Sequence, residues 1–183
     1  MSTDNFWTNG PSVDPKRGFR FKVSIGTLGM LWMAKKVDRP TFSLTESKHE
    51  YLNHSFYWPA RAEWSEVSMT LVDPTNPDIA SSLLGFIATA GYNIIGQPQN
   101  DGELSSIGKS NAIAATGDIT IEQINETGVT LETWTLKNAW IKEVDFSELD
   151  YSNDDLSEVT VKVRYDWAEF SAGTAGPTLF GLN

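Results

Sequence analysis

The feature that most constrains the fold is a strictly alternating run from Glu158 to Trp167. Its odd-numbered positions are apolar or aromatic: Val159, Val161, Val163, Tyr165 and Trp167. Its even-numbered positions are polar or charged: Glu158, Thr160, Lys162, Arg164 and Asp166. Successive side chains of a β-strand point to opposite faces of a sheet, so this period of two predicts a strand with one dry and one wet face.

Length and composition favour a single folded domain. The 183 residues suffice for one domain with a real core, and 40% hydrophobic with 21% charged residues is ordinary for a folded protein. No apolar run is long enough for a membrane helix, and Met1–Asn5 lacks the basic and apolar regions of a signal peptide. We therefore expect a protein made in the cytosol without membrane insertion. The absence of cysteine excludes disulfides and thiolate metal sites.

Charge is unevenly distributed along the chain. Residues 1–61 carry a balance of plus four, whereas residues 62–183 carry minus fourteen, which gives the net charge of −10. A soluble acidic protein is the simpler interpretation. The sharper one is that one end of a molecule complements another end of a neighbouring copy, as in head-to-tail stacking. Binding of nucleic acid by the whole surface is not expected, since that needs a basic footprint.

The chain reads as six or seven strands, one helix and long loops. We expect an N-terminal arm over 1–18, a β-sandwich domain over 19–170 and a flexible C-terminal tail over 171–183. The segment 93–110 is rich in Gly, Asn, Gln and Ser and reads as an exposed loop. A bend near Asn138 separates two further strand-like runs.

Two segments inside the domain stand out. Residues 41–60 have no clean period but are rich in aromatic residues, which predicts an arm loop that packs against something. Residues 77–90 have helical spacing of apolar residues, with Asn76 as the expected cap, Pro77 in the first turn and Gly91 at the end. A single helix among strands is expected to lie across one sheet.

Motifs for catalysis or cofactors fail on inspection. Gly108-Lys109-Ser110 ends like a phosphate-binding loop, but Glu103 stands where the motif requires Gly. The segment that begins at Asp150 resembles the start of a calcium-binding loop, but it lacks the Gly and the Glu that such a loop requires. We therefore expect a turn there. His49 and His54 are the only histidines, and loop histidines usually pack or form hydrogen bonds. We expect no enzyme, no cofactor and no metal.

Several short motifs together resemble a known family. They are Asp14-Pro15 with Phe19-Arg20-Phe21-Lys22-Val23, Glu63-Trp64-Ser65-Glu66-Val67 leading to Leu71-Val72-Asp73, Leu136-Lys137-Asn138-Ala139-Trp140-Ile141, and Leu149-Asp150-Tyr151 leading to Tyr165-Asp166-Trp167. In order and spacing they resemble the tail tube proteins of contractile-tailed, T4-like bacteriophages over about residues 15–168. The N-terminal arm and the Gly-rich tail depart from that pattern.

The resemblance implies a mainly β fold of two packed antiparallel sheets, a sandwich or barrel flanked by one α-helix with a long extended arm loop. It also implies hexameric rings with a continuous luminal β-barrel, stacked into a tube that conducts DNA inside a contractile sheath. Implied partners are further copies of the chain, the sheath, baseplate and tail terminator proteins, and a tape measure protein in the lumen. DNA would pass without specific binding, and the protein would reside in the virion after assembly in the host cytoplasm.

With this family in view, two sets of residues acquire expected roles. The inter-subunit arm is expected to use Phe42, Tyr51, His54, Phe56, Tyr57 and Trp58. The acidic luminal or stacking face is expected to use Asp118, Glu122, Glu143, Asp145, Glu148, Asp150 and Glu158. The alternatives are a tube-initiating baseplate protein, an inner tube protein similar to that of type VI secretion, and a hydrolase that uses a carboxylate pair between Glu143 and Asp150.

Overall fold

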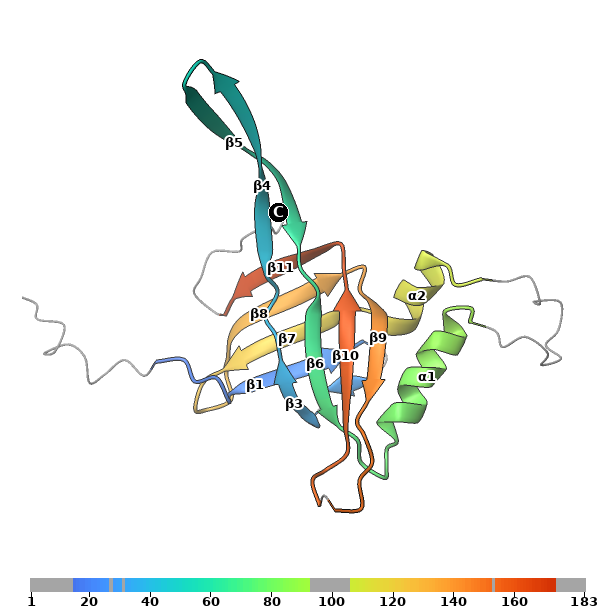
Figure 1. Ribbon diagram of the computed structural model, residues 1–183. Helices are drawn as coiled ribbons and strands as arrows, with labels where there is room; N and C mark the ends of the chain where they lie inside the picture. The colour runs from blue at the N-terminus through green and yellow to red at the C-terminus, as the bar shows by residue number, and fades with distance from the viewer. Residues whose placement is uncertain (1–14, 27, 31, 93–105, 153, 174–183) are drawn as a thin grey trace, which may run out of the picture.

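Two antiparallel sheets pack face to face, and a long two-stranded hairpin extends from one of them (Figure 1). The computed structural model describes residues 15–26, 28–30, 32–92, 106–152 and 154–173. The predicted N-terminal arm through residue 14, most of the predicted loop at 93–105 and the predicted tail from residue 174 lie outside these residues. Within them, no helix is long and apolar enough to cross a membrane.

The larger sheet has five strands in the order β11-β8-β7-β1-β2. Their bounds are β1 Phe21–Ile25, β2 Gly29–Met30, β7 Ile119–Ile124, β8 Thr130–Lys137 and β11 Trp167–Ala172. The smaller sheet has four strands in the order β3-β6-β10-β9. Their bounds are β3 Ala34–Val37, β6 Val67–Val72, β9 Trp140–Phe146 and β10 Glu158–Arg164.

The core lies between the sheets, whose strands run crosswise in Figure 1. In β10 the predicted dry face is confirmed, because Val159, Val161 and Val163 are all at most 1% exposed. Facing strands follow the same period. The other fully buried strand residues include Val23, Ile25, Val67, Met69, Leu71, Ile119 and Leu136. Alternation therefore places one apolar set from each sheet into a shared interior.

The predicted strand 158–167 is in fact two strands in different sheets. β10 ends at Arg164, the chain turns through Tyr165 and Asp166, and β11 begins in the five-stranded sheet at Trp167. Trp167 is consequently 43% exposed rather than part of the dry face. The bend expected near Asn138 is confirmed. Asn138 has a positive φ of 54°, and the turn that it makes separates β8 from β9.

The predicted helix is present as α1, Ile79–Thr89, but its cap is Asp78 rather than Asn76. The Asp78 carboxylate accepts a hydrogen bond from the Ser81 backbone N–H at 2.9 Å, and Asp73 accepts one from the Ile79 N–H at 3.1 Å. These carboxylates satisfy the first free N–H groups, so the helix begins after them. Its buried residues, Ile79 and Leu83, join the core.

A second helix, α2 at Lys109–Thr116, was not predicted. It is short and buries only small residues, Ala112, Ala115 and Thr116, so the sequence carries no large apolar period there. Figure 1 shows α1 and α2 beside β9, where they cover one flank of the two sheets.

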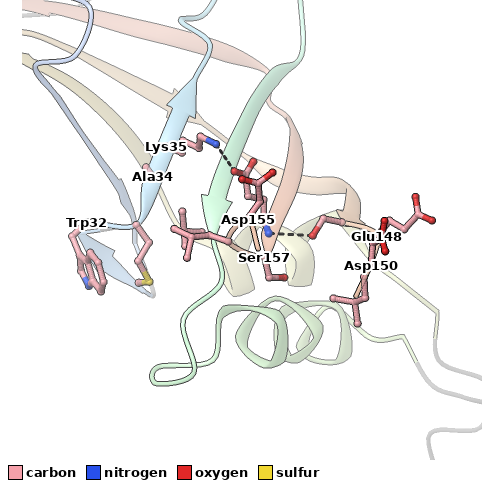
Figure 2. A pocket seen from close by; sticks show the side chains of 13 residues that line it. Trp32, Ala34, Lys35, Glu148, Asp150, Asp155 and Ser157 are labelled. Carbon is pink, nitrogen blue, oxygen red and sulfur yellow. Dashed lines mark hydrogen bonds and ion pairs between the residues drawn. The ribbon is translucent and has the colours of Figure 1, made fainter. Parts of the chain in front are cut away.

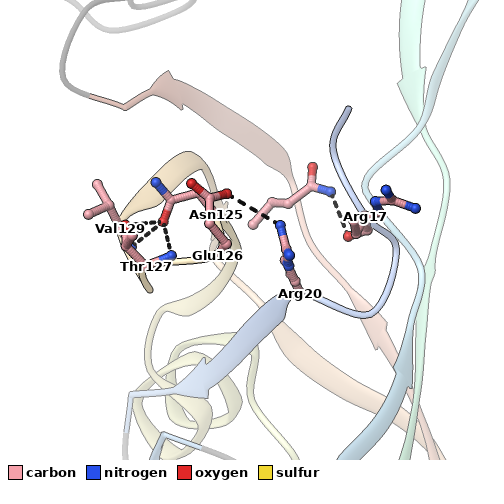
Figure 3. Close-up of polar contacts among 7 residues, drawn as sticks. Arg17, Arg20, Asn125, Glu126, Thr127 and Val129 are labelled. Atoms are coloured by element: carbon pink, nitrogen blue, oxygen red, sulfur yellow. Dashed lines mark hydrogen bonds and ion pairs between the residues drawn. The ribbon is translucent and has the colours of Figure 1, made fainter. Parts of the chain in front are cut away.

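The turn between β7 and β8 is held by one side chain, as Figure 3 shows. The Asn125 Oδ1 accepts hydrogen bonds from the Thr127 N–H at 3.0 Å and the Val129 N–H at 2.8 Å. Gly128 takes a positive φ of 81° there, and Arg20 reaches Glu126 at 3.4 Å. The hydrogen bonds fix the conformation of this exposed turn, which lies away from the long projecting hairpin.

Candidate assembly surfaces

The predicted arm loop at 41–60 is a β-hairpin of β4 (Phe42–Tyr51) and β5 (His54–Trp64) that projects from the body (Figure 1). The hairpin continues the edge of the four-stranded sheet, because β3 leads into β4 and β5 leads into β6. Two backbone hydrogen bonds bridge the junction, Ser65 N–H to Thr41 O at 2.9 Å and Asp38 N–H to Ser68 O at 2.9 Å. At about 3.3 Å per residue, ten-residue strands span about 33 Å.

Aromatic side chains gather on one face of this arm. Tyr51 pairs with His54, and His49 pairs with Phe56, so these four share a face with Trp58. The ring centroids of Phe56 and Trp58 lie 6.2 Å apart, and those of His49 and Trp58 lie 6.1 Å apart. All six residues predicted for the arm are exposed: Phe42, Tyr51, His54, Phe56, Tyr57 and Trp58. Their role between subunits stays a prediction.

Tilted aromatic rings lie in contact at the base of the arm. Phe42 and Trp64 have ring centroids 5.1 Å apart, and Trp64 lies 5.9 Å from Tyr165. Trp64, Trp140 and Tyr165 also line a cavity of about 910 Å³ between the arm and α2. The buried Tyr165 hydroxyl has no hydrogen-bond partner among the described residues, and burial raises its pKa to about 12.

The predicted acidic residues are divided between three places. Asp118 lies at the start of the five-stranded sheet and Glu122 within it, where Asp118 pairs with Lys137 at 3.0 Å. The four-stranded sheet carries Glu143, Asp145 and Glu158. Glu148 and Asp150 lie in the β9–β10 loop. The chain therefore does not bring the seven carboxylates onto one face.

Basic residues accompany the carboxylates on the outer face of the four-stranded sheet. Lys162 lies 2.8 Å from Glu143, and this hydrogen bond raises the pKa of the lysine. A register shift between β9 and β10 leaves Lys142 without a residue opposite it on β10. The Lys142 ammonium donates a hydrogen bond to the Glu66 carboxylate, and this bond lowers the pKa of Glu66. This face is consequently of mixed charge in the single copy.

A groove of about 840 Å³ lies beside the β9–β10 loop, at the end of the body opposite the arm, and Figure 2 shows the side chains that line it. It is formed by the residues before β3, the start of β3 and the β9–β10 loop. Figure 2 shows Trp32 and Asp150 on opposite sides of the groove, with Asp155 between them. The Lys35 ammonium donates a hydrogen bond to the Glu158 carboxylate, and this bond raises the pKa of Lys35.

Asp150 organises the loop beside this groove. Its carboxylate accepts hydrogen bonds at 2.9 Å from both the backbone N–H and the hydroxyl of Ser152, and these bonds lower its pKa. The turn favoured over a calcium loop is therefore what the described residues form. Across the described part of the chain, no group of three or more His, Asp or Glu side chains is arranged to hold a metal ion.

Sequence reasoning missed a buried carboxylate, Glu132 on β8. It is 5% exposed and forms ion pairs with Lys16 and with Arg39, the latter at 3.2 Å. Burial opposes its ionisation, but the hydrogen bonds from both cations hold the pKa of Glu132 below its ordinary value. Its only sequence signal is a charged residue at an inward position of a strand. The contact joins the segment before β1 to the segment that leads into the arm.

No known protein family matches the sequence, and no curated protein matches it. Solved structures do resemble the fold. A chain in the tube-terminating cap of the anti-feeding prophage aligns with a TM-score of 0.66 at 14% identity, over 88% of this chain and 93% of that chain. A chain in the sheath/tube terminator of the extracellular contractile injection system PVC gives 0.65 at 17% identity, over 88% and 99%.

A third chain, in the PVC sheath–tube complex in its extended state, gives a TM-score of 0.61 at 16% identity, over 94% of this chain and 99% of that chain. The protein therefore has a fold that also occurs in tube and terminator assemblies of contractile injection systems. The expectation of a mainly β tube-protein fold is confirmed at this level.

Proposed function

We propose that this protein is a structural subunit of the tube in a contractile-tail particle, in which identical copies form rings that stack. The single observation that carries the proposal is the arm, which presents its aromatic residues to solvent in one copy. Exposed aromatic patches of this kind mark surfaces that another protein covers. The fold shared with chains in injection-system assemblies agrees with this role.

Assembly buries arm side chains that are exposed in the single copy, and this burial contributes a favourable free energy of association. Tyr57 and Trp58 are 56% and 51% exposed. If a neighbour buries about 100 Å² of each ring, then at roughly 25 cal/mol per Å² each contributes about 2.5 kcal/mol to association. Two such residues are enough to shift the balance between single copies and assemblies by several powers of ten.

Ring formation is proposed to use the edges of the four-stranded sheet. β3 and β9 are its edge strands, and each has one side without a partner strand among the described elements. Unpaired edges are sites of strand pairing, and closure into a ring removes them. Six copies joined in this way form the continuous luminal β-barrel, with the polar outer face of the sheet toward the bore.

The finer proposal is a bacteriophage tail tube with a bore of mixed charge, in which carboxylates paired with lysines leave no excess of positive charge to hold the phosphates of passing DNA. Its partners are the sheath, baseplate, terminator and tape measure proteins, and its place is the tail of the virion. The role is structural rather than enzymatic. Glu143, Asp145, Glu148 and Asp150 are all exposed to solvent, and this exposure supports a surface role for them.

The second candidate is a component of the tube end, such as a tube-initiating baseplate protein, or the inner tube of a secretion machine. The likeness to chains in cap and terminator structures favours an end component. An end component caps growth or starts it, whereas a tube subunit polymerises without limit.

Electron microscopy of the purified, concentrated protein tests the proposal. We expect six-fold rings and tubes of unlimited length, with size-exclusion chromatography showing a concentration-dependent shift to large species. Single rings that never stack would favour the end component. A monomer at every concentration and ionic strength would overturn both.

A further inference from the structure

The two ends of the molecule carry surfaces that suit each other. Figure 1 shows the arm at one end and the β9–β10 loop at the other, with the four-stranded sheet between them. The arm points away from its own body, so its tip does not reach the groove of the same copy. A contact between the tip of one copy and the groove of the next repeats from copy to copy and builds an open-ended stack.

The groove is apolar as well as acidic. Leu149, Leu156 and Trp32 line it and are 87%, 70% and 75% exposed. Large apolar side chains so exposed lose contact with water only when another molecule covers them. Lys35 is the single basic residue among those that line the groove, and it pairs with Glu158. The acidic residues of the groove are Glu148, Asp150, Asp155 and Glu158.

The tip of the arm has the complementary chemistry. Tyr51 and Leu52 are 64% and 86% exposed at the turn of the hairpin. Two of their neighbours, His49 and His54, supply ring N–H donors that suit carboxylates. The nearby Lys48 pairs with Glu50 on its own strand, so the two cancel in charge.

We propose that the arm tip, residues 49–54, docks in the groove between Trp32 and the β9–β10 loop of a second copy of this chain in the adjacent ring. Leu52 and Tyr51 cover Leu149 and Leu156, and the two histidines donate hydrogen bonds to Glu148 and neighbouring carboxylates. This inference rests on the proposed function, and it names the surfaces that hold one ring to the next.

A substitution at the turn residue Leu52 tests the docking without destabilising the fold. Its φ is 51°, a left-handed conformation that costs energy for leucine and suits asparagine. Leu52→Asn therefore eases the turn while it removes the apolar contact. We expect the variant to melt at or above the temperature of the unaltered protein, and its critical concentration for stacking to rise about tenfold.

Cross-linking tests the contact directly, because the chain contains no cysteine of its own. Full-length Asn53→Cys is mixed with full-length Ser157→Cys, one of them enlarged by a tag, and the mixture is oxidised mildly. Ser157 lines the groove and is exposed. We expect a mixed dimer on a denaturing gel. The matched control pairs Asn53→Cys with Glu126→Cys on the β7–β8 turn, for which no mixed dimer is expected.

The outcomes separate this inference from the proposed function. Tubes without the mixed dimer, or an equal yield with the Glu126 control, overturn the docking but leave the tube role intact. A specific mixed dimer in a protein that forms no tubes supports the docking and overturns the tube role. A Leu52→Asn variant that stacks at the concentration of the unaltered protein also counts against the docking.

Discussion

The Asn138 side-chain amide donates a hydrogen bond to the Asp166 carboxylate at 2.8 Å, and this bond joins two of the places where the chain passes between sheets. Asn138 lies between β8 and β9, and Asp166 lies between β10 and β11. Lys109 at the start of α2 contacts both oxygens of Asp166 at 2.8 Å. One carboxylate thus holds two sheet corners and a helix together.

Asp166→Ala is expected to lower the free energy of unfolding by about 1–2 kcal/mol, because it removes two charge-assisted partners at a partly exposed site. Urea denaturation at pH 7 measures the change. The matched control is Asp145→Ala on β9, an exposed carboxylate, for which a change within about 0.5 kcal/mol is expected. Equal effects of the two variants would show that the corner contact adds nothing.

The same carboxylate makes stability depend on pH. The hydrogen bonds from Lys109 and Asn138 lower the pKa of Asp166. A group with a lowered folded pKa contributes stability above its unfolded pKa, about 3.9 for Asp, and this contribution is lost as pH falls further through the folded pKa. The difference in unfolding free energy between the unaltered protein and Asp166→Asn is expected to shrink below about pH 4. A constant difference down to pH 2 would contradict this assignment.

Leu83 and Leu84 are adjacent in α1 but differ fully in burial, at 0% and 54% exposed. Leu83→Ala is expected to cost about 2–5 kcal/mol, since it removes a core side chain and leaves a cavity. Leu84→Ala is expected to stay within about 0.5 kcal/mol. Thermal unfolding of both variants measures the contrast. Similar losses would mean that α1 does not face the core as described.

The contrast between the core and the arm explains how much of the fold the sequence predicts. Val159, Val161 and Val163 alternate with polar residues because only one face of β10 is dry, and that pattern is local. The arm has solvent on both faces, so its residues 41–60 show no such period. Its turn at Leu52 and Asn53 also lacks the Asn-Gly or Asp-Gly signal typical of two-residue hairpins. The hairpin was therefore predicted as a loop.

The candidate surfaces were predictable only in part, for a related reason. Composition identified the aromatic arm residues, because their clustering within one segment is visible in the sequence. The groove is formed by Trp32, which precedes β3, and by Leu149 in the β9–β10 loop; only the sheet order β3-β6-β10-β9 places these two distant segments at the same end of the sheet. The contact of Lys16 with Glu132 spans 116 positions and has no local signature.

Removal of the arm aromatics is expected to separate folding from assembly. The double variant Tyr57→Ala, Trp58→Ala changes exposed side chains, so the melting temperature of the single copy is expected to change by less than about 2 °C. Tube growth is expected to stop at concentrations where the unaltered protein polymerises. Sedimentation and electron microscopy measure growth. Normal polymerisation of the double variant would refute a role of the arm between subunits.

Glu132 links the segment before β1 to the foot of the arm, and its replacement tests that link. Glu132→Gln leaves Lys16 and Arg39 without a charged partner, but their side chains are 50% and 65% exposed and turn readily to water. The loss is therefore expected to be about 1–2 kcal/mol, below the 3–5 kcal/mol typical of a fully buried broken pair. Trypsin is also expected to cleave faster after Lys16, and amide hydrogen exchange is expected to speed up around Arg39, where Pro40 blocks cleavage, because both segments lose their anchor to β8.

Glu169→Gln provides the matched control for this pair of measurements. Glu169 lies 3.8 Å from Lys137 at a partly exposed position, so its replacement is expected to change stability by less than about 0.5 kcal/mol and to leave the trypsin pattern unaltered. If Glu132→Gln lowers stability without faster cleavage after Lys16 or faster hydrogen exchange around Arg39, the carboxylate serves the core alone. Faster cleavage after Lys16 together with faster exchange around Arg39, with the control unchanged, ties the arm and the segment before β1 to one buried charge.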